Sequence, residues 1–145
     1  MSNIHRLQRF VDAQSKVYEE VRSELRAGRK TSHWIWFIFP QIQGLGHSAT
    51  AREFAILSLE EAAAYASHPI LGPRLRECTR LVNAIEGRAI RQILGTPDDL
   101  KFRSSMTLFA QVCPDDPIFT DAIHKYYGGA FDALTLDLLR SVKSE

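Results

Sequence analysis

Basic and aromatic side chains stand close together near residue 30. Arg29, Lys30 and His33 carry or can gain positive charge, and Trp34 and Trp36 follow at once. Cationic donors at a helix junction can hold a phosphate or carboxylate, while an indole ring stacks on a planar group. The spacing therefore predicts a site for a small anionic ligand that contains a ring. The alternative is an exposed basic turn beside a core helix, where cations complement the end of the preceding helix.

A second polar group lies later in the chain. Arg103, Ser104 and Ser105 interrupt a segment that otherwise favours helix. Because residues that contradict local preference can mark a functional site, we predict that these three side chains, together with Gln41, add polar contacts to the same ligand. The alternative is that the serines are small to allow close packing, with Arg103 paired to an aspartate earlier in the same helix.

Other catalytic or metal-binding arrangements have little support. No serine stands in a G-x-S-x-G turn, and the five histidines lack the HExxH spacing of a zinc site. His47 and His68 could act as general bases, because an unperturbed imidazole titrates near neutral pH. A His-Pro step such as that at His68 more often forms a turn with a capping hydrogen bond. We expect no metal and no cofactor, and leave enzymatic activity open.

Residues 44–49, GLGHSA, match the dinucleotide-binding pattern G-x-G-x-x-G/A and follow the apolar residues 34–39. In a Rossmann fold, the glycine turn directly follows a strand of a parallel sheet. Here Pro40 and three further residues intervene, and no second strand pattern is found. We interpret residues 34–39 as a short buried helix, capped by Thr31 or Ser32 and ended near Pro40, although Trp, Ile and Phe individually favour strands.

The remaining segments have helical patterns. Apolar residues recur every three or four positions over residues 4–25, which predicts one amphipathic helix, capped by Ser2 or Asn3 and ended at Gly28. Further helices are predicted from a capping box at Ser58 and Glu61 to His68, from Pro69 or Pro73 to residue 86, over residues 88–94, and from about Asp132. Two more are predicted to begin with an N-cap, Thr96 or Asp116, followed by a proline, Pro97 or Pro117, at the first helical position. The sequence thus predicts an all-α fold, a compact multihelical array of about six to eight helices in a single domain over residues 1–145.

Composition limits the class of protein. Apolar residues make up 45% and charged residues 24%, which is typical of soluble globular domains. The chain has 18 Lys and Arg residues and 17 Asp and Glu residues, so its formal net charge is only +1. We therefore expect no nucleic-acid or membrane partner, although a local basic patch could exist. The first ten residues lack the apolar centre of a signal peptide, so we expect a cytoplasmic protein whose Cys78 and Cys113 are buried free thiols.

Three blocks of the sequence resemble a known family. GRKTSHWIWFIFPQIQGLGHS (residues 28–48), SLEEAAAYASHPILGPRL (58–75) and KFRSSMTLF (101–109) are similar to the bacterial family of unknown function DUF1810, sometimes labelled calpastatin. The resemblance covers nearly the whole chain and implies a compact all-α fold with no established activity. The calpastatin label does not fit, because that inhibitor is a long disordered chain.

A more distant resemblance bears on function. The order of a Gly-Arg pair, a Ser-Met-aromatic helix and an aspartate-proline helix before two glycines is similar to the NADAR proteins, which are associated with NAD and ADP-ribose metabolism. None of their catalytic residues corresponds position by position.

We therefore expect the protein to bind a nucleotide-like anion of the NAD or ADP-ribose type. A stronger form of the hypothesis is that the protein also processes this ligand. Trp34 and Trp36 would form the floor of the cleft, provided that the basic residues near position 30 come close to Arg103. The alternative is a protein–protein interaction module without catalytic activity, which would expose an apolar patch of several hundred Å². The oligomeric state stays open.

Overall fold

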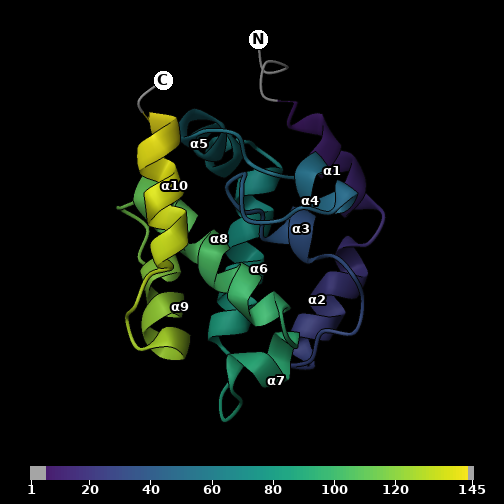
Figure 1. Ribbon diagram of the computed structural model, residues 1–145. Coiled ribbons are helices and arrows are strands. Elements are labelled where there is room, and N and C mark those ends of the chain that lie inside the picture. The colour runs from purple at the N-terminus through teal and green to yellow at the C-terminus, as the bar shows by residue number, and fades with distance from the viewer. Residues whose placement is uncertain (1–5, 144–145) are drawn as a thin grey trace.

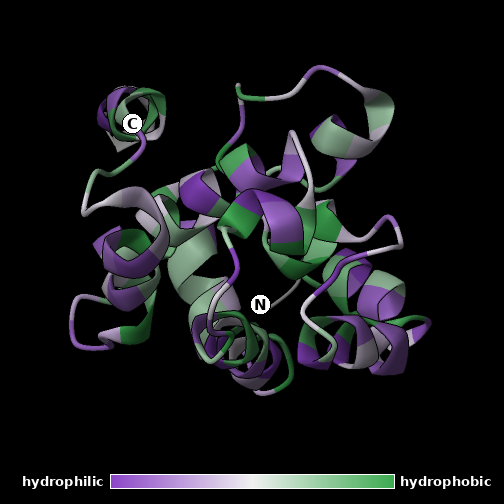
Figure 2. Ribbon diagram, turned by 90° about the horizontal axis from the view of Figure 1, so that it is seen from below, coloured by the Kyte–Doolittle hydropathy of each residue, from purple (hydrophilic) through white to green (hydrophobic). Residues whose placement is uncertain are grey.

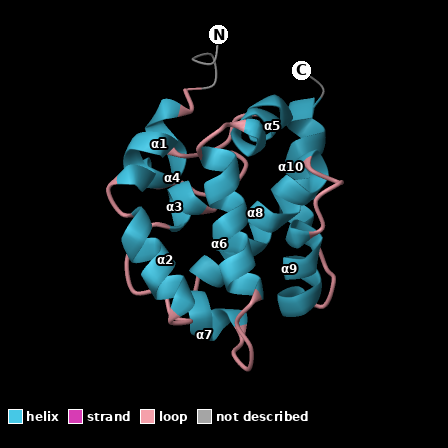
Figure 3. Cartoon of the chain, turned by 180° about the vertical axis from the view of Figure 1, so that it is seen from behind, coloured by secondary structure: helices cyan, strands magenta, loops and turns pink. Residues whose placement is uncertain are grey.

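A computed structural model describes residues 6–143, and this part of the chain forms ten helices joined by loops (Figures 1 and 3). They are α1 (Gln8–Ser15), α2 (Tyr18–Arg26), α3 (Ile35–Ile38), α4 (Ala49–Glu53), α5 (Leu59–Ser67), α6 (Leu71–Asn83), α7 (Ile90–Leu94), α8 (Asp98–Val112), α9 (Ile118–Tyr127) and α10 (Ala133–Lys143). The predicted all-α class is confirmed, but the predicted number of six to eight helices is wrong. None of the described helices is long and apolar enough to cross a membrane.

The first predicted helix is two helices. The chain leaves helical geometry at Val17, with φ −131° and ψ 2°, and the two halves then pack on different partners, α1 on α3 and α2 on α6. The predicted caps at Ser2 and Asn3 lie outside the described residues. Gly28 ends α2 as predicted, because its φ of +76° belongs to the left-handed region that glycine adopts readily.

Helices α6 and α8 lie at the centre of the molecule (Figure 1). α8 packs on α5, α7, α9 and α10, and α6 packs on α2, α5 and α9. Residues 104–110 of α8 are all buried, so this part of the helix is enclosed around its whole circumference. Aromatic contacts link it to distant parts of the chain, with ring centroids 4.8 Å apart for Phe39 and Phe102 and 5.5 Å apart for Tyr65 and Phe109.

The aromatic segment forms the predicted short helix, α3, but only part of that helix is buried. Ile35 and Ile38 are buried, as are Trp34 and Phe39 at its two ends, whereas its other two residues are half-buried. Its predicted cap is wrong, because Trp34 is the N-cap residue and makes no capping hydrogen bond, while the Ser32 hydroxyl donates to Glu24 instead. The loop that follows contains the two glycines and makes one isolated parallel bridge, between Ile42 and Ile56. Since residues 6–143 contain no strand, the structure contradicts a dinucleotide-binding sheet.

Local capping interactions follow the sequence. The Ser58 hydroxyl accepts a hydrogen bond from the Glu61 N–H at 3.0 Å, and the Glu61 carboxylate accepts one from the Leu57 N–H at 2.8 Å. The imidazole Nδ1 of His68 accepts hydrogen bonds from two backbone N–H groups of the following turn, at 3.0 and 3.2 Å. The prediction that His68 forms a capped turn is therefore confirmed.

The proline-led helices begin one residue later than predicted. Pro97 and Pro117 are the N-cap residues of α8 and α9, rather than their first helical residues. Their carbonyl groups accept the N–H groups of Lys101 and Asp121 at 3.2 and 2.8 Å. Proline suits this position because it has no N–H to leave unpaired.

The two cysteines are free thiols. Cys78 is buried as expected, and burial raises the pKa of its thiol to about 12. Cys113 is only half-buried, which corrects the expectation for that residue.

Gly72 marks a close approach between α5 and α6, and its replacement gives a test of this packing. A β-carbon on Gly72 would lie 2.3 Å from the Ala66 carbonyl oxygen. We expect Gly72→Ala to lower the free energy of unfolding by about 2–3 kcal/mol, because the two backbones must separate. Gly87→Ala is the control, since its β-carbon would meet nothing within 4 Å and only its φ of +77° is strained, at a cost of about 1 kcal/mol. Urea denaturation that finds the larger loss at Gly87 would contradict this account.

Candidate functional site

A cleft of about 550 Å³ lies between the loop after α3, helix α4 and the first turns of α8 and α10. We call it the Trp36 cleft. It is lined by Trp36, Gln41, Leu45, Gly46, His47, Ser48, Ala51, Pro97, Leu100, Lys101, Ser104, Asp132 and Leu134. It therefore joins three parts of the chain that are separated by about 30 to 50 residues in sequence.

Trp36 forms one wall of the cleft. Its indole is half-buried, and the Lys101 ammonium lies 5.5 Å from the centre of the ring. Lys101 also approaches the Asp98 carboxylate at 3.6 Å, one turn earlier in α8. An aromatic face and a cation thus stand side by side at the same hollow.

The polar side of the cleft is built around Asp132. Its carboxylate accepts hydrogen bonds from the Thr135 N–H at 3.0 Å, the Thr135 hydroxyl at 2.6 Å and the Ser104 hydroxyl at 3.4 Å. Its own N–H donates to the Thr107 hydroxyl at 2.9 Å. Asp132 therefore caps α10 and fixes its start on α8. The predicted start of this helix at about Asp132 is confirmed.

Apolar side chains form the rim. Leu100 and Leu134 are 55% and 54% exposed, and they are two of the four large hydrophobic side chains that are exposed among the described residues. Leu45 also lines the cleft and packs partly against the core. A hollow with a mostly apolar rim and a few polar groups is typical of a small-molecule site.

Three of the nine predicted site residues, Trp36, Gln41 and Ser104, line the Trp36 cleft. Ser105 does not, because it is fully buried in the core, where its hydroxyl has no hydrogen-bond partner among the described residues. Arg103 does not line the cleft either. Its guanidinium donates to the Ala130 carbonyl at 2.9 Å and lies 5.5 Å from the Tyr127 ring.

The residues near position 30 do not converge with Arg103. Lys30 pairs with Asp98 at 2.7 Å, and its ammonium lies 5.1 Å from the Trp34 ring, so this cation is held in a buried ion pair. Arg29 and His33 are exposed and line none of the hollows described here. The predicted basic group is therefore split between a structural ion pair and the surface.

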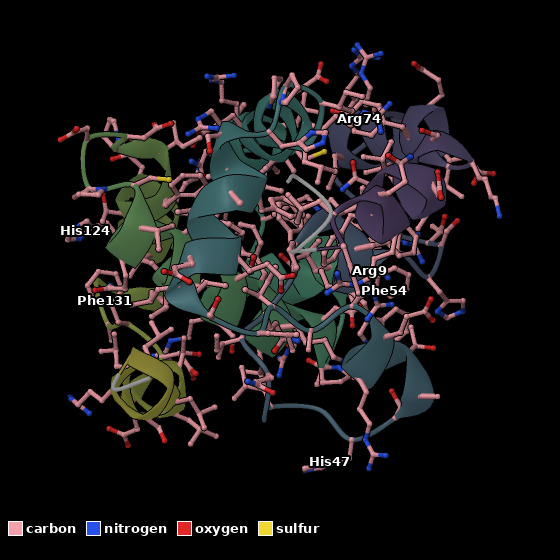
Figure 4. All side chains as sticks on the ribbon, turned by 90° about the horizontal axis from the view of Figure 1, so that it is seen from above. Arg9, His47, Phe54, Arg74, His124 and Phe131 are labelled. Carbon is pink, nitrogen blue, oxygen red and sulfur yellow. The ribbon has the colours of Figure 1, made fainter. Side chains whose placement is uncertain are left out.

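Sequence reasoning missed Lys101, Asp132 and the two rim leucines as members of the site, and treated His47 only as a candidate base. His47 lies on the loop at the edge of the molecule (Figure 4). The sequence offers one weak signal for the leucines, because each follows a predicted helix start, where polar residues are more usual. Among the described residues, no group of three or more His, Cys, Asp or Glu side chains could hold a metal ion.

Glu24 organises the segment that leads into α3. Its carboxylate accepts hydrogen bonds from the Thr31 N–H at 2.9 Å, the Ser32 N–H at 3.1 Å, the Ser32 hydroxyl at 2.6 Å and the Trp34 indole N–H at 2.9 Å. Burial acts to raise the pKa of Glu24, but these hydrogen bonds, first that of the Ser32 hydroxyl, lower it to about 2. The only polar atom of the Trp34 side chain, the indole nitrogen, is thereby hydrogen-bonded to Glu24, so Trp34 has a structural role.

These features define an all-helical protein with a cleft rimmed by apolar side chains. The chain belongs to the family described as "Protein of unknown function (DUF1810)", whose family model matches residues 4–139. It is similar to the solved structure of the conserved hypothetical protein Rv1873 from Mycobacterium tuberculosis, with 54% identity over 95% of this chain and 99% of that chain and a TM-score of 0.94. No curated protein matches the chain. The resemblance to DUF1810 is therefore confirmed.

The role of Glu24 is tested by Glu24→Gln, which keeps the size of the side chain and removes its charge. Because the pKa is lowered from 4.5, the ionised carboxylate stabilises the folded state above about pH 4.5, and this contribution is lost as the pH falls toward 2. We expect the variant to lose about 1–3 kcal/mol at pH 7 and less at pH 3. Urea denaturation at both pH values measures this, with Glu20→Gln on the exposed side of α2 as control. An equal loss at the two pH values would refute the assignment.

Proposed function

We propose that the Trp36 cleft binds a small anionic ligand that contains a ring, of the nucleotide type represented by NAD and ADP-ribose. The observation that carries the proposal is the half-buried Trp36 ring beside the Lys101 ammonium, at 5.5 Å, on a hollow of about 550 Å³. This volume lies within the range of about 300–1,000 Å³ that small-molecule sites occupy.

Each wall suits a different part of such a ligand. The Trp36 ring, with Leu45 and Leu100, offers an apolar surface for a planar base. Lys101 offers a positive charge for a phosphate, and its present contact with Asp98 is 3.6 Å, longer than a good hydrogen bond. A phosphate could therefore compete for this ammonium.

The remaining polar groups favour a nucleotide over a simple inorganic anion. Asp132 presents a carboxylate, which accepts hydrogen bonds and repels a bare anion, while the Gln41 amide can both donate and accept. Ribose hydroxyls and the amino groups of a base match these partners. If the ligand is also processed, the His47 imidazole and the Asp132 carboxylate are the groups in the lining whose chemistry suits a general acid or base.

A specific observation supports a second function, that of a protein-interaction module. Leu100 and Leu134 are each more than half exposed and lie on the same rim. An apolar side chain of a partner protein that entered the cleft would cover both leucines and remove them from water. This alternative needs no charge at Lys101, so the two functions differ in their dependence on that residue.

Thermal unfolding in the presence of NAD, ADP-ribose and AMP tests the proposal. A ligand at 100 times its dissociation constant adds about 2.7 kcal/mol to the apparent free energy of unfolding, so we expect a higher Tm with at least one of them. Trp36→Leu and Lys101→Met should each abolish the shift, because they remove the stacking surface and the charge.

Lys16→Met is the matched control, since it removes an exposed cation that does not line the cleft. A shift that survives in Trp36→Leu and Lys101→Met would place the ligand elsewhere. No shift with any of the three ligands would reject the nucleotide site and favour the interaction module.

A further inference from the structure

Positive charge is concentrated at one end of the molecule. The end of α2, the loop after α6 and the helix α7 meet there, at the bottom of Figure 1, and Figure 2 looks onto this end. We call it the basic end, defined by the exposed side chains of Arg26, Arg29, Arg88, Arg91 and Lys125. It is separate from the Trp36 cleft, because none of these five residues lines that cleft.

Arg88 holds the basic end together. Its guanidinium donates to the Gly28 carbonyl at 3.0 Å and to the Gln92 carbonyl at 3.0 Å, which ties the end of α2 to α7. Two neighbouring hollows share this residue. One, of about 450 Å³, is also lined by Arg26, and the other, of about 510 Å³, by Arg91 and Lys125. The cations therefore follow one another along a continuous surface.

Three of these cations are available to a ligand. Arg26, Arg29 and Arg91 are exposed, and their side chains make no hydrogen bond or ion pair with any residue in the described range 6–143. Lys125, by contrast, contacts Glu86 at 3.0 Å. An unpaired guanidinium matches the oxygens of a phosphate through parallel hydrogen bonds, which makes arginine well suited to phosphate recognition.

The basic end carries a clear excess of charge. Four of its five cations line the two hollows (Arg26, Arg88, Arg91 and Lys125), against two carboxylates, those of Glu86 and Asp99. The whole chain has 18 cations and 17 carboxylates, so the rest of the molecule has more acidic than basic groups. The formal net charge of +1 is the sum over both regions, so it does not show that the basic end is positive and the rest of the molecule negative.

We propose that the basic end binds the phosphate backbone of a nucleic acid. A row of exposed arginines along two shallow hollows provides successive contacts for the regularly spaced phosphates of such a chain. The attraction is local, because a charge acts over about 10 Å at 0.1 M salt. This surface differs from the expectation drawn from the net charge, which predicts no nucleic-acid partner.

The surroundings favour a nucleic acid over an anionic membrane. The large hydrophobic side chains that are exposed among the described residues are Leu57, Ile70, Leu100 and Leu134, and none of them lines either hollow. Proteins that bind a membrane surface usually insert apolar side chains beside their cations. The aromatic residue in these hollows, Tyr126, is half-buried and donates its hydroxyl to the Val82 carbonyl. Because no aromatic side chain stands free for stacking in these two linings, we expect binding with little sequence preference.

Fluorescence anisotropy with a labelled DNA duplex of about 20 base pairs and mixed sequence, beginning at about 50 mM salt, tests the proposal. We expect binding that weakens with salt, with a slope of log K against log salt of about −3, since each phosphate contact contributes about −0.9. The triple variant Arg26→Gln/Arg29→Gln/Arg91→Gln should bind at least about tenfold more weakly and lose most of the slope.

The matched control is Arg6→Gln/Lys16→Gln/Arg52→Gln. It removes the same charge from exposed residues next to α1 and in α4, away from α7 (Figure 1). It should keep the slope and most of the affinity, and thermal unfolding of both triple variants verifies that they fold. Absence of binding at about 50 mM salt, or an equal loss in the two variants, would overturn the proposal. Tighter binding to phosphatidylserine vesicles or to tripolyphosphate than to the duplex would overturn it as well.

Discussion

The burial of residues 34–39 is the constraint on which the rest of the structure depends. A helix of four residues is not stable alone, so α3 exists only because its neighbours enclose it. The Gln14 amide and the Tyr65 hydroxyl donate to the Phe37 carbonyl at 2.6 and 3.2 Å, which joins α1 and α5 to α3. Phe39 packs edge-on against Phe102 of α8. The Glu24 carboxylate fixes the chain where it enters this helix, so distant parts of the sequence meet at one short segment.

This arrangement decides which side chains line the Trp36 cleft. Trp34 is the N-cap residue of α3 and enters the core, whereas Trp36 lies within the helix and reaches the cleft. Helical geometry separates the consecutive residues of α8, because each residue is turned by about 100° from the one before it. Ser104 faces the cleft, Ser105 the core, and Arg103 the loop between α9 and α10. Neighbours in sequence thus have different roles because helical periodicity directs them to different surroundings.

The charges near residue 30 divide in a similar way. Lys30 is committed to Asp98 at the start of α8 and stabilises the junction between α2 and α8. Arg29, one residue earlier, is exposed and follows Gly28, whose carbonyl accepts a hydrogen bond from Arg88 of the basic end. Within one short turn, one cation therefore has a structural role and the other extends a surface that we assign to an anionic partner. The Trp36 cleft and the basic end are separate, so a ligand at one and a partner at the other do not compete for the same residues.

The sequence by itself determined the features that depend on near neighbours. Each of these features involves groups within a few residues of one another, so local patterns could reveal it: the left-handed Gly28, the Ser58 cap, the His68 turn and the helix start at Asp132. The all-α class and the family could also be predicted from the sequence. Only the tertiary structure decided the break at Val17, the short helix α4, and which cations are paired. It also decided that Trp36, Lys101 and Asp132 share a cleft. The physical reason is that such convergence depends on how distant helices pack, and no local hydrogen bond or periodicity in the sequence records that packing.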